Sequence, residues 1–343
     1  MAAINNTFEI PQSLNAKVPA EQRGAGRDDV RLMVMNGEEI HHERFSSLPD
    51  FLEEGDLLVF NNSRTIPAVL KAKACNREME IRLSRQLDHQ RWEALIWGGL
   101  FSAGDELELK NGVKAVITGI GNEKPLVTLK FSIGGVDLMD YIYSYGEPIR
   151  YEYIDSPWKL DVYQTAYASV PGSVEMASAG RAFSWRMLEK LKEKGVQTAF
   201  LTLHTGLSYY GNDRWPNPQK HPESFHIPEE TAKLIHAVRE KKGRVIAVGT
   251  TVVRALETAA DEKGYVSESK GITNLYIQKD HQLKAVDGLV TGLHEPEATH
   301  LEMLAAFTYE HHLFDAYRQA LKKGYLWHEF GDMNLIFAER TQS

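Results

Sequence analysis

The sequence predicts an α/β protein: a discontinuous α/β domain with a small β-barrel inserted into it. Strands alternate with helices from about residue 136 to the end of the chain, whereas residues 69–131 hold short β-rich segments with no helix between them. The chain has 343 residues, more than a single hydrophobic core usually serves. We therefore expect an α/β catalytic domain of residues 1–68 and 132–343, and a barrel of residues 69–131.

The first segment of the α/β domain begins with a hairpin. In "RLMVMNGEEIHHERF" two β-rich runs flank Asn36-Gly37, a dipeptide that favours a tight two-residue turn. "SSLPDFL" then predicts a short helix, and residues 57–60 a buried strand. The polar residues 61–65 predict a loop at the end of that strand.

The inserted segment reads as a series of short strands. They are "EIRLS", "WEALIWG", "DELELK", "KAVITGI" and "LVTLKF", separated by Gly, Asn and charged residues. Regular short strands without helices are typical of a small barrel or sandwich.

The last segment alternates between helix and strand. Helices are predicted for "FSWRMLEKLKEKG", which Gly195 ends, for "PEETAKLIHAVREKKG", for "TVVRALETAA" and for the whole run of residues 298–324. Strands are predicted for "VQTAFLTLH", "RVIAV", "TNLYIQ", "AVDGLVTG" and "FGDMNLIFA".

Composition limits the classes of function. The formal net charge is −8, which argues against a protein that coats nucleic acid non-specifically. Cys75 is the single cysteine, so no internal disulfide forms and a reducing compartment is expected. The N-terminus lacks the features of a signal peptide, and no apolar run reaches the roughly 20 residues of a membrane span. We expect a cytoplasmic protein with no membrane contact, and no feature indicates a protein partner.

One strand-to-helix turn predicts a ligand site. In "RVIAVGTTVVRALETAA" the apolar residues 245–248 run into Gly249, and a helix follows at once. Glycine lets the backbone approach a ligand, Thr250 or Thr251 can cap the helix, and the first N–H groups favour an anion. Arg254 lies one turn further on, near the same mouth. The alternative is that Arg254 only pairs with Glu257 on the surface.

Five segments, in this order, closely resemble the S-adenosylmethionine:tRNA ribosyltransferase-isomerase family of queuosine biosynthesis. They are "GDLLVFNNSRTIPAVL", "YQTAYASVPGSV", "KLKEKGVQTAFLTLHTGL", "RVIAVGTTVVRALETAA" and "FGDMNLI". The resemblance implies an α/β domain with an inserted barrel. It implies transfer of the ribosyl part of S-adenosylmethionine to a deazaguanine base in tRNA, to give epoxyqueuosine. It also implies that tRNA is a partner and that no cofactor or metal is needed beyond S-adenosylmethionine as substrate.

The sequence departs from the family pattern at several motifs. The family's "PTAGLHF" is "ASAGRAF" here, with Ala177, Arg181 and Ala182 at the changed positions. "GLGTF" is "GLSYY", "HxMHxE" is "PQKHPE", "TNFHLP" is "TGLHEP", and "YPG" is absent near Lys279. A divergent paralogue with another acceptor, or one that only binds a nucleoside-like ligand, is therefore the alternative to the standard enzyme.

The reaction implied by the resemblance needs a base beside the sulfonium, a group that handles the departing adenine, and donors to the ribose hydroxyls. Strand ends, the long loop between strand and helix that holds His221 and Glu223, and the family motifs together give the candidate residues. We expect catalytic roles for His204, His221, Glu223 and His294, and substrate binding by Asn61, Asn62, Arg64, Arg181, Thr250, Thr251, Arg254 and Asp287. For each, a structural role in a turn, core or surface pair is the alternative.

A metal-dependent hydrolase is the alternative from another class. "HEPEATH" looks like a zinc-protease helix, but its second histidine is too distant and Pro296 would break the helix. The paired histidines at positions 41–42 and 311–312 have no supporting ligands at metal spacing. We expect no metal site.

Overall fold

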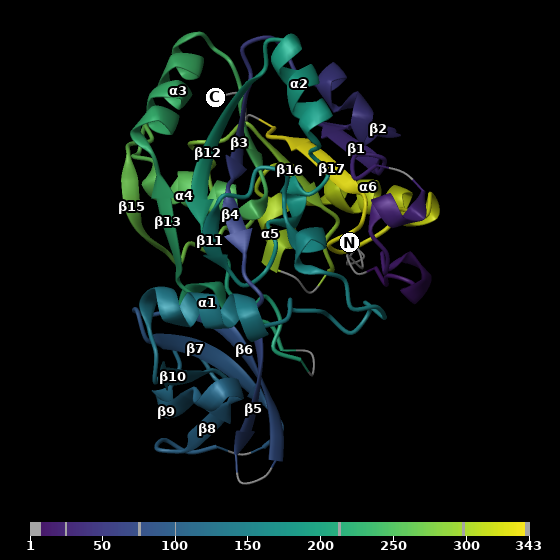
Figure 1. Ribbon diagram of the computed structural model, residues 1–343. Helices are drawn as coiled ribbons and strands as arrows, with labels where there is room; N and C mark the ends of the chain where they lie inside the picture. Colours follow the sequence, from purple (N-terminus) through teal and green to yellow (C-terminus); the bar gives the residue numbers. More distant parts are fainter. Residues whose placement is uncertain are drawn as a thin grey trace, which may run out of the picture.

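The computed structural model describes residues 8–24, 26–74, 77–99, 101–211, 214–296 and 299–339. Cys75 lies outside these residues. The chain forms an α/β body above a closed β-barrel, with helix α1 (Gly135–Tyr145) lying across the near end of the barrel (Figure 1). This confirms the predicted fold class.

The body is built on a nine-stranded mixed sheet in the order β15-β13-β12-β3-β14-β16-β17-β1-β2. Its strands are β1 (Arg31–Asn36), β2 (Glu39–Arg44), β3 (Leu57–Asn61), β12 (Gln197–Leu203), β13 (Glu223–Ile227), β14 (Val245–Val248), β15 (Ser269–Thr273), β16 (Gly288–Gly292) and β17 (Met333–Phe337). Strands β12, β3, β14 and β16 are parallel neighbours. Leu57 of β3 is in register with Val245 of β14, so the segments before and after the barrel share one sheet, as predicted.

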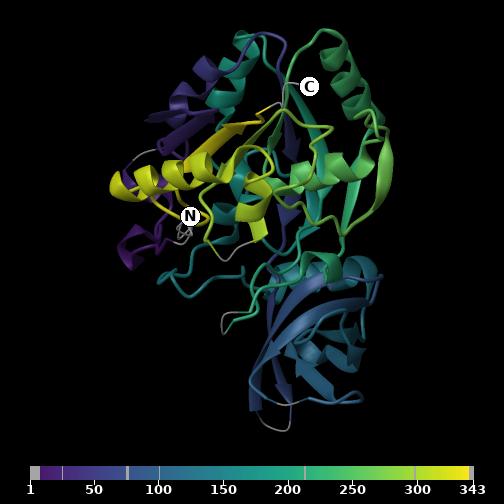
Figure 2. The ribbon, with the colours of Figure 1, turned by 180° about the vertical axis from the view of Figure 1, so that it is seen from behind.

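Helices cover both faces of this sheet because its central strands are apolar on both sides. In β3, Leu57 and Val59 pack into one core, and Leu58 and Phe60 pack into the other. Helix α2 (Trp185–Glu193) and the 3-10 helix Phe45–Phe51 lie on the second side. Helices α3 (Glu229–Glu240), α4 (Thr250–Ala259), α5 (Thr299–Leu304) and α6 (Glu310–Lys322) supply the first side, where α4 and α6 cross the face seen in Figure 2.

The barrel closes through antiparallel neighbours in the order β10-β7-β6-β5-β8-β9. Its strands are β5 (Val69–Ala74), β6 (Arg77–Gln86), β7 (Arg91–Trp97), β8 (Glu106–Leu109), β9 (Lys114–Ile120) and β10 (Val127–Phe131). Its core contains Trp92 and Leu129, and it continues into Leu207 and Tyr210 of the loop after β12. The barrel therefore supports a loop of the α/β body.

Several predicted elements are wrong. Residues 63–65 form a short strand, β4 (Ser63–Thr65), which pairs with β11 (Val170–Ser173) and is no loop. The strand predicted in "TNLYIQ" is β15, at Ser269–Thr273, because the Thr273 hydroxyl accepts the Leu275 N–H and turns the chain. The predicted C-terminal helix is two helices, because the backbone carbonyl of Phe307 accepts an N–H bond from Glu339 after β17.

No helix in the described part of the chain is long and apolar enough to cross a membrane.

Candidate active site

A cleft of about 760 Å³ opens at the carboxyl ends of β12, β14 and β16. This is the edge at which parallel α/β sheets usually bind ligands. The walls come from segments far apart in sequence, including residues 151–153, 175–179, 205–209, 249–251, 291–295 and 328–329. Six of the twelve predicted site residues line it: His221, Glu223, Thr250, Thr251, Arg254 and His294.

The turn from β14 into α4 forms one edge of the cleft. Gly249 has φ 101° and ψ 147°, a conformation that residues with a Cβ rarely adopt. It is the N-cap of α4, and no side chain caps the helix, so the predicted capping by Thr250 or Thr251 is wrong. Both threonines line the cleft instead. The first turn of the helix therefore borders the space where a ligand would lie.

Arg254 extends from this first turn into the cleft, with 14% of its side chain exposed. Its Nε donates to the Leu275 carbonyl at 3.0 Å, and its Nη1 pairs with Glu223. Its Nη2 is buried and has no hydrogen-bond partner among the described residues. Glu257 accepts backbone N–H bonds from Lys284 and Ala285 instead, so the surface pair between Arg254 and Glu257 does not form.

His221 and Glu223 lie beside Arg254. Glu223 accepts the Gly206 N–H at 3.2 Å through its other carboxylate oxygen. The Nδ1 of His221 contacts the Tyr210 hydroxyl at 3.2 Å, while its buried Nε2 has no partner among the described residues. Burial lowers the pKa of His221 below its ordinary value, which favours the neutral ring. A neutral imidazole with an open nitrogen can accept a proton.

His294 also lines the cleft. Its Nε2 is 2.8 Å from the Thr291 hydroxyl, and its ring stacks on His300 with centroids 4.9 Å apart. Burial lowers the pKa of His294 well below its ordinary value and also lowers the pKa of His300. Both rings are therefore kept neutral.

The cleft also contains two tyrosine–glutamate pairs that the sequence did not indicate. Tyr151 donates to Glu175, which also accepts the Ser208 N–H at 2.8 Å. Tyr153 donates to Glu329 at 2.9 Å. Burial raises the pKa of Glu175 above its ordinary value and the pKa of Glu329 to about 8. In the sequence, the two glutamates stand out only as isolated acidic residues: Glu175 in "SVEMA" and Glu329 in "LWHEF".

His328 holds the second pair in place. It has φ 73°, a left-handed conformation that is uncommon outside glycine and clusters at functional sites. Its ring stacks on Tyr153 with centroids 4.1 Å apart, and its nitrogens contact Glu295 at 3.2 Å and Asn15 at 3.0 Å.

Four of the predicted site residues lie next to the cleft without lining it. Asn61 is buried and bonds the backbone of Ser63 and Leu203, with a weaker contact of 3.4 Å to Thr251. The other three are Asn62, Arg64 and His204. The side-chain oxygen of Asn62 accepts from the Thr202 hydroxyl, and Arg64 is exposed on β4. The Nδ1 of His204 lies 2.8 Å from the Ser63 hydroxyl.

His204 is enclosed by backbone. A Cβ on Gly172 would lie 2.6 Å from its ring, and burial lowers its pKa. The predicted convergence of Asn62, Arg64 and His204 on the cleft is therefore wrong: Asn62 and His204 bond to neighbouring chain segments, and Arg64 is exposed on β4.

Arg181 and Asp287 also lie outside the lining of the cleft. Arg181 is 4% exposed and donates to Glu21 at 2.7 Å and to the Val162 carbonyl, so it ties chain segments together. Asp287 precedes β16 at the amino end of the strand, where it accepts the Val245 N–H and pairs with Arg239. Neither lines the cleft: Arg181 is buried against Glu21 and the Val162 carbonyl, and Asp287 lies at the amino end of β16, away from the carboxyl ends where the cleft opens.

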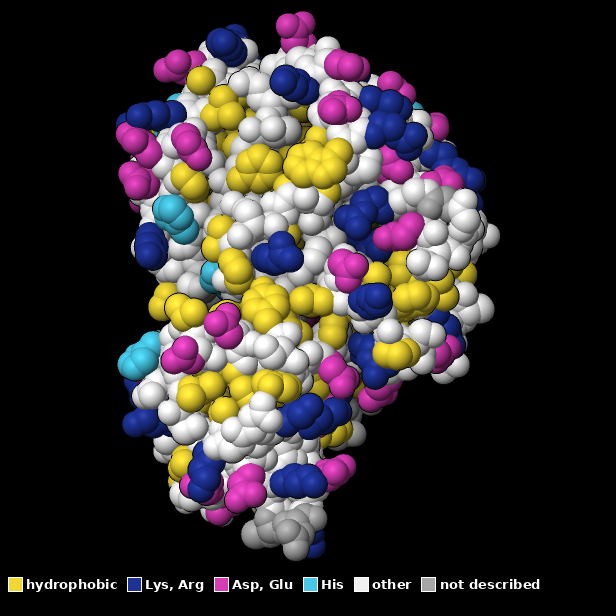
Figure 3. Space-filling view, in the orientation of Figure 1, with side chains coloured by type: hydrophobic (Ala, Val, Ile, Leu, Met, Phe, Trp, Pro, Cys, Tyr) yellow, Lys and Arg dark blue, Asp and Glu magenta, His cyan; other side chains and the backbone are white. Residues whose placement is uncertain are grey.

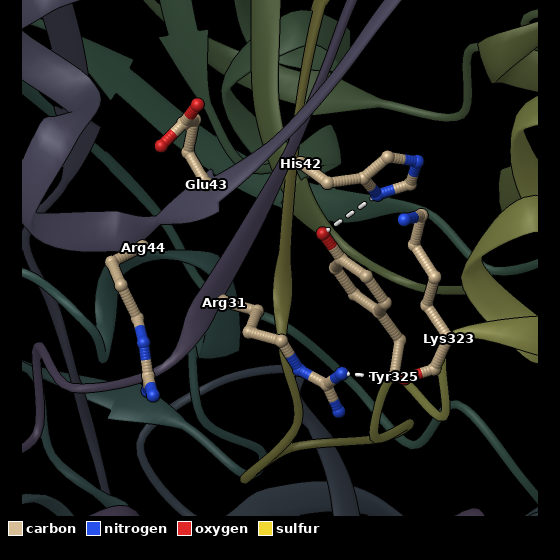
Figure 4. Close-up of a pocket in the computed structure, with 6 residues that line it drawn as sticks. All are labelled: Arg31, His42, Glu43, Arg44, Lys323 and Tyr325. Atoms are coloured by element: carbon tan, nitrogen blue, oxygen red, sulfur yellow. Dashed lines mark hydrogen bonds between the residues drawn. The ribbon is translucent and has the colours of Figure 1, made fainter.

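A smaller pocket of about 370 Å³ lies between β1, β2 and the end of α6 (Figure 4). Two of its cations already have partners: Arg31 pairs with Asp332, and Arg44 pairs with Asp29. The His42 Nδ1 contacts the Tyr325 hydroxyl at 3.0 Å. These contacts give the pocket a structural role.

Charges elsewhere are dispersed. On the face shown in Figure 3, basic and acidic side chains intermingle, and hydrophobic side chains lie between the barrel and the body. Among the described residues, no three His, Cys, Asp or Glu side chains are grouped so that they could hold a metal ion.

Comparison with known proteins gives consistent results. A family model described as queuosine biosynthesis protein matches residues 5–336. The S-adenosylmethionine:tRNA ribosyltransferase-isomerase of Thermoanaerobacter sp. (strain X514) is 35% identical, over 96% of this chain and 98% of that protein. The crystal structure of the S-adenosylmethionine tRNA ribosyltransferase of Thermotoga maritima has a TM-score of 0.54 and 33% identity, and covers 96% of this chain and 98% of its own.

Proposed function

This chain belongs to the queuosine biosynthesis protein family, and we propose that it performs the ribosyl transfer and isomerisation for which its relative is named, in the cleft described above. The donor is S-adenosylmethionine, and the acceptor is a deazaguanine base in tRNA. The product is epoxyqueuosine in the tRNA. No cofactor is used beyond S-adenosylmethionine as substrate.

The observation that best supports this proposal is the open Nη2 of Arg254 beside the first turn of α4. A buried guanidinium nitrogen without an acceptor favours an anionic ligand group. The N-terminus of the helix adds to the attraction. The carboxylate of the methionine part of S-adenosylmethionine has the charge and the planar shape that fit this place.

The neutral histidines suit the proton transfers. Protons beside a sulfonium are acidic enough to need only a well-placed base, and our candidate is the Nε2 of His221, which has no hydrogen-bond partner among the described residues. His294, whose Nε2 contacts the Thr291 hydroxyl, also lines the cleft, where it would contact a ribose hydroxyl or the departing adenine. Glu223 would orient Arg254.

The second candidate function is a divergent paralogue with another acceptor. The changed motif around Ala177–Ala182 favours it, because Arg181 turns away from the cleft to pair with Glu21 while Ala177 lines the cleft. The donor site is common to both candidates, so the acceptor alone separates them.

One experiment tests the proposal. The protein would be incubated with S-adenosylmethionine and tRNA that carries the aminomethyl-deazaguanine precursor, and the digested nucleosides analysed by mass spectrometry. We expect the mass of epoxyqueuosine, with release of adenine and methionine. Binding of S-adenosylmethionine without a modified nucleoside would favour the paralogue, and failure to bind S-adenosylmethionine would contradict both.

A further inference from the structure

One wall of the cleft carries two carboxyl groups that lack a positive partner. Glu175 is held by Tyr151 and Ser208, and Glu329 by Tyr153. In the described part of the chain, no Lys, Arg or His nitrogen lies within ion-pair distance of either carboxyl. We name Tyr151, Tyr153, Glu175 and Glu329 the acidic wall.

The cations that line the cleft or act on Glu329 are engaged elsewhere, and Lys17 of the cleft pairs with Asp155. Arg254 pairs with Glu223, Arg181 pairs with Glu21, and His328 contacts Glu295. The charged groups that act on Glu329 are Glu175 and Glu295, which oppose its ionisation, and Arg181, which favours it. Burying a carboxyl without a counter-cation is costly, and its hydroxyl partner offsets only part of that cost.

A second buried polar group in the same cleft also lacks a partner. His221 is 6% exposed, and its Nε2 has no partner among the described residues. A Cβ on Gly206 would lie 2.1 Å from this nitrogen, so only a glycine leaves the histidine its place. Gly206 and His221 both line the cleft that the acidic wall borders.

We propose that the acidic wall is a subsite for an organic cation, which supplies the missing positive charge. The inference rests on the proposed function, which offers two sources of that cation: the sulfonium of S-adenosylmethionine and the protonated amine of the acceptor. The tyrosine rings are nearly parallel, with centroids 6.0 Å apart and planes at 20°, and they offer aromatic surface to either cation.

Binding of the cation is coupled to a proton. Glu329 holds a proton at neutral pH because burial raises its pKa to about 8. When a cation lies beside it, the carboxyl ionises and the proton leaves to solvent, so the pair is neutral and no covalent bond changes. Ligand binding therefore releases a proton.

The test is calorimetric titration of the full-length protein with two matched pairs of probes. The first pair is S-adenosylmethionine and S-adenosylhomocysteine, which lacks the sulfonium charge. The second pair is a deazaguanine base that carries an aminomethyl group and the same base with a neutral hydroxymethyl group. Titration in buffers of different ionisation enthalpy measures the released proton.

The variants are Glu175→Gln, Glu329→Gln and the double variant. Glutamine keeps the size of the side chain and an acceptor for the tyrosine hydroxyl. The control is Glu302→Gln, because Glu302 accepts from Tyr276 in a tyrosine–glutamate pair outside the cleft.

In the double variant, we expect the ratio of the affinities for the cationic and the neutral member of one pair to fall at least about tenfold. This is the loss expected for a missing charged contact. The pair that loses its preference identifies the source of the cation. The inference would be overturned if the double variant kept the wild-type affinity ratios in both pairs and still released the proton. Failure of the wild-type protein to bind S-adenosylmethionine would contradict the proposed function instead, and the amine pair would then decide the inference alone.

Discussion

Arg254 is the residue to which the proposed function assigns the carboxylate of the donor. Because its Nε and Nη1 already have acceptors, Nη2 is left for the ligand. Lysine cannot reproduce several directed bonds from one planar group. Arg254→Lys should weaken S-adenosylmethionine binding at least tenfold, which corresponds to about 1.5–3 kcal/mol for a charged hydrogen bond.

Calorimetric titration measures this effect. The matched control is Arg239→Lys, since Arg239 also pairs with a buried carboxylate, Asp287, but does not line the cleft. Its affinity for the donor should stay within about twofold of wild type. Equal affinities for the Arg254 variant and the wild-type protein would return Arg254 to a structural role.

Glu329 makes the free energy of unfolding fall as pH rises. Its pKa is about 8 in the folded protein, and about 4.3 in an unfolded chain. Between these values the folded state binds the extra proton, so the free energy of unfolding falls as pH rises from about 4.5 to about 8. Glu329→Gln removes this dependence.

Urea unfolding at several pH values checks this prediction. The stability of the wild type relative to Glu329→Gln should be greatest below about pH 4.5 and should decline up to about pH 8. The difference isolates Glu329 from other titrating groups, such as the buried histidines. A difference that stays constant with pH would show that Glu329 titrates normally in the folded protein.

At the scale of the element, the turn between β14 and α4 depends on Gly249. Its φ of 101° is strained for any residue with a Cβ, although a Cβ itself would meet nothing closer than 3.5 Å. Gly249→Ala should therefore cost about 1–3 kcal/mol of stability through the backbone. It should also weaken donor binding, because the first turn of α4 would shift.

Gly37→Ala is the control for this variant. Gly37 also has a positive φ, 59°, but it lies in the β1–β2 hairpin with nothing within 4 Å of an added Cβ. Gly37→Ala should lower the stability of the protein and leave its affinity for the donor unchanged. If Gly249→Ala kept wild-type affinity in titration despite a lower melting temperature, the turn would not position the ligand.

At the scale of the whole molecule, the net charge is −8, so the salt dependence of tRNA affinity shows whether the phosphates are contacted. Phosphate contacts release counterions, so tRNA affinity should fall roughly tenfold between about 50 and about 200 mM salt even for a few contacts. Donor binding in the recessed cleft should change much less. Fluorescence anisotropy with labelled tRNA measures the first and calorimetry the second. Salt-independent tRNA binding would contradict recognition through the phosphates.

The barrel and the body act as one framework for the cleft. The barrel core continues into Leu207 and Tyr210, and Tyr210 in turn contacts His221. The insertion therefore supports the loop that carries a candidate base.

The sequence alone determined most of the elements and the position of the turn from β14 into α4. Periodicity predicted the hairpin, the barrel strands and the shared sheet because these depend on local apolar patterns. The strand ends and "GTT" motif located Thr250, Thr251 and Arg254 because carboxyl ends of parallel strands meet at one edge. The family motifs added His221, Glu223 and His294, which line the same cleft.

Only the tertiary structure decided which polar side chains face the cleft. His204 and Asn62 also follow strands, yet they bond to neighbouring chain segments. Tyr151, Tyr153, Glu175 and Glu329 lie in three separate segments, and no local pattern distinguishes them. The direction of a side chain and the burial that sets its pKa depend on residues distant in sequence, so they emerge only when the chain is folded.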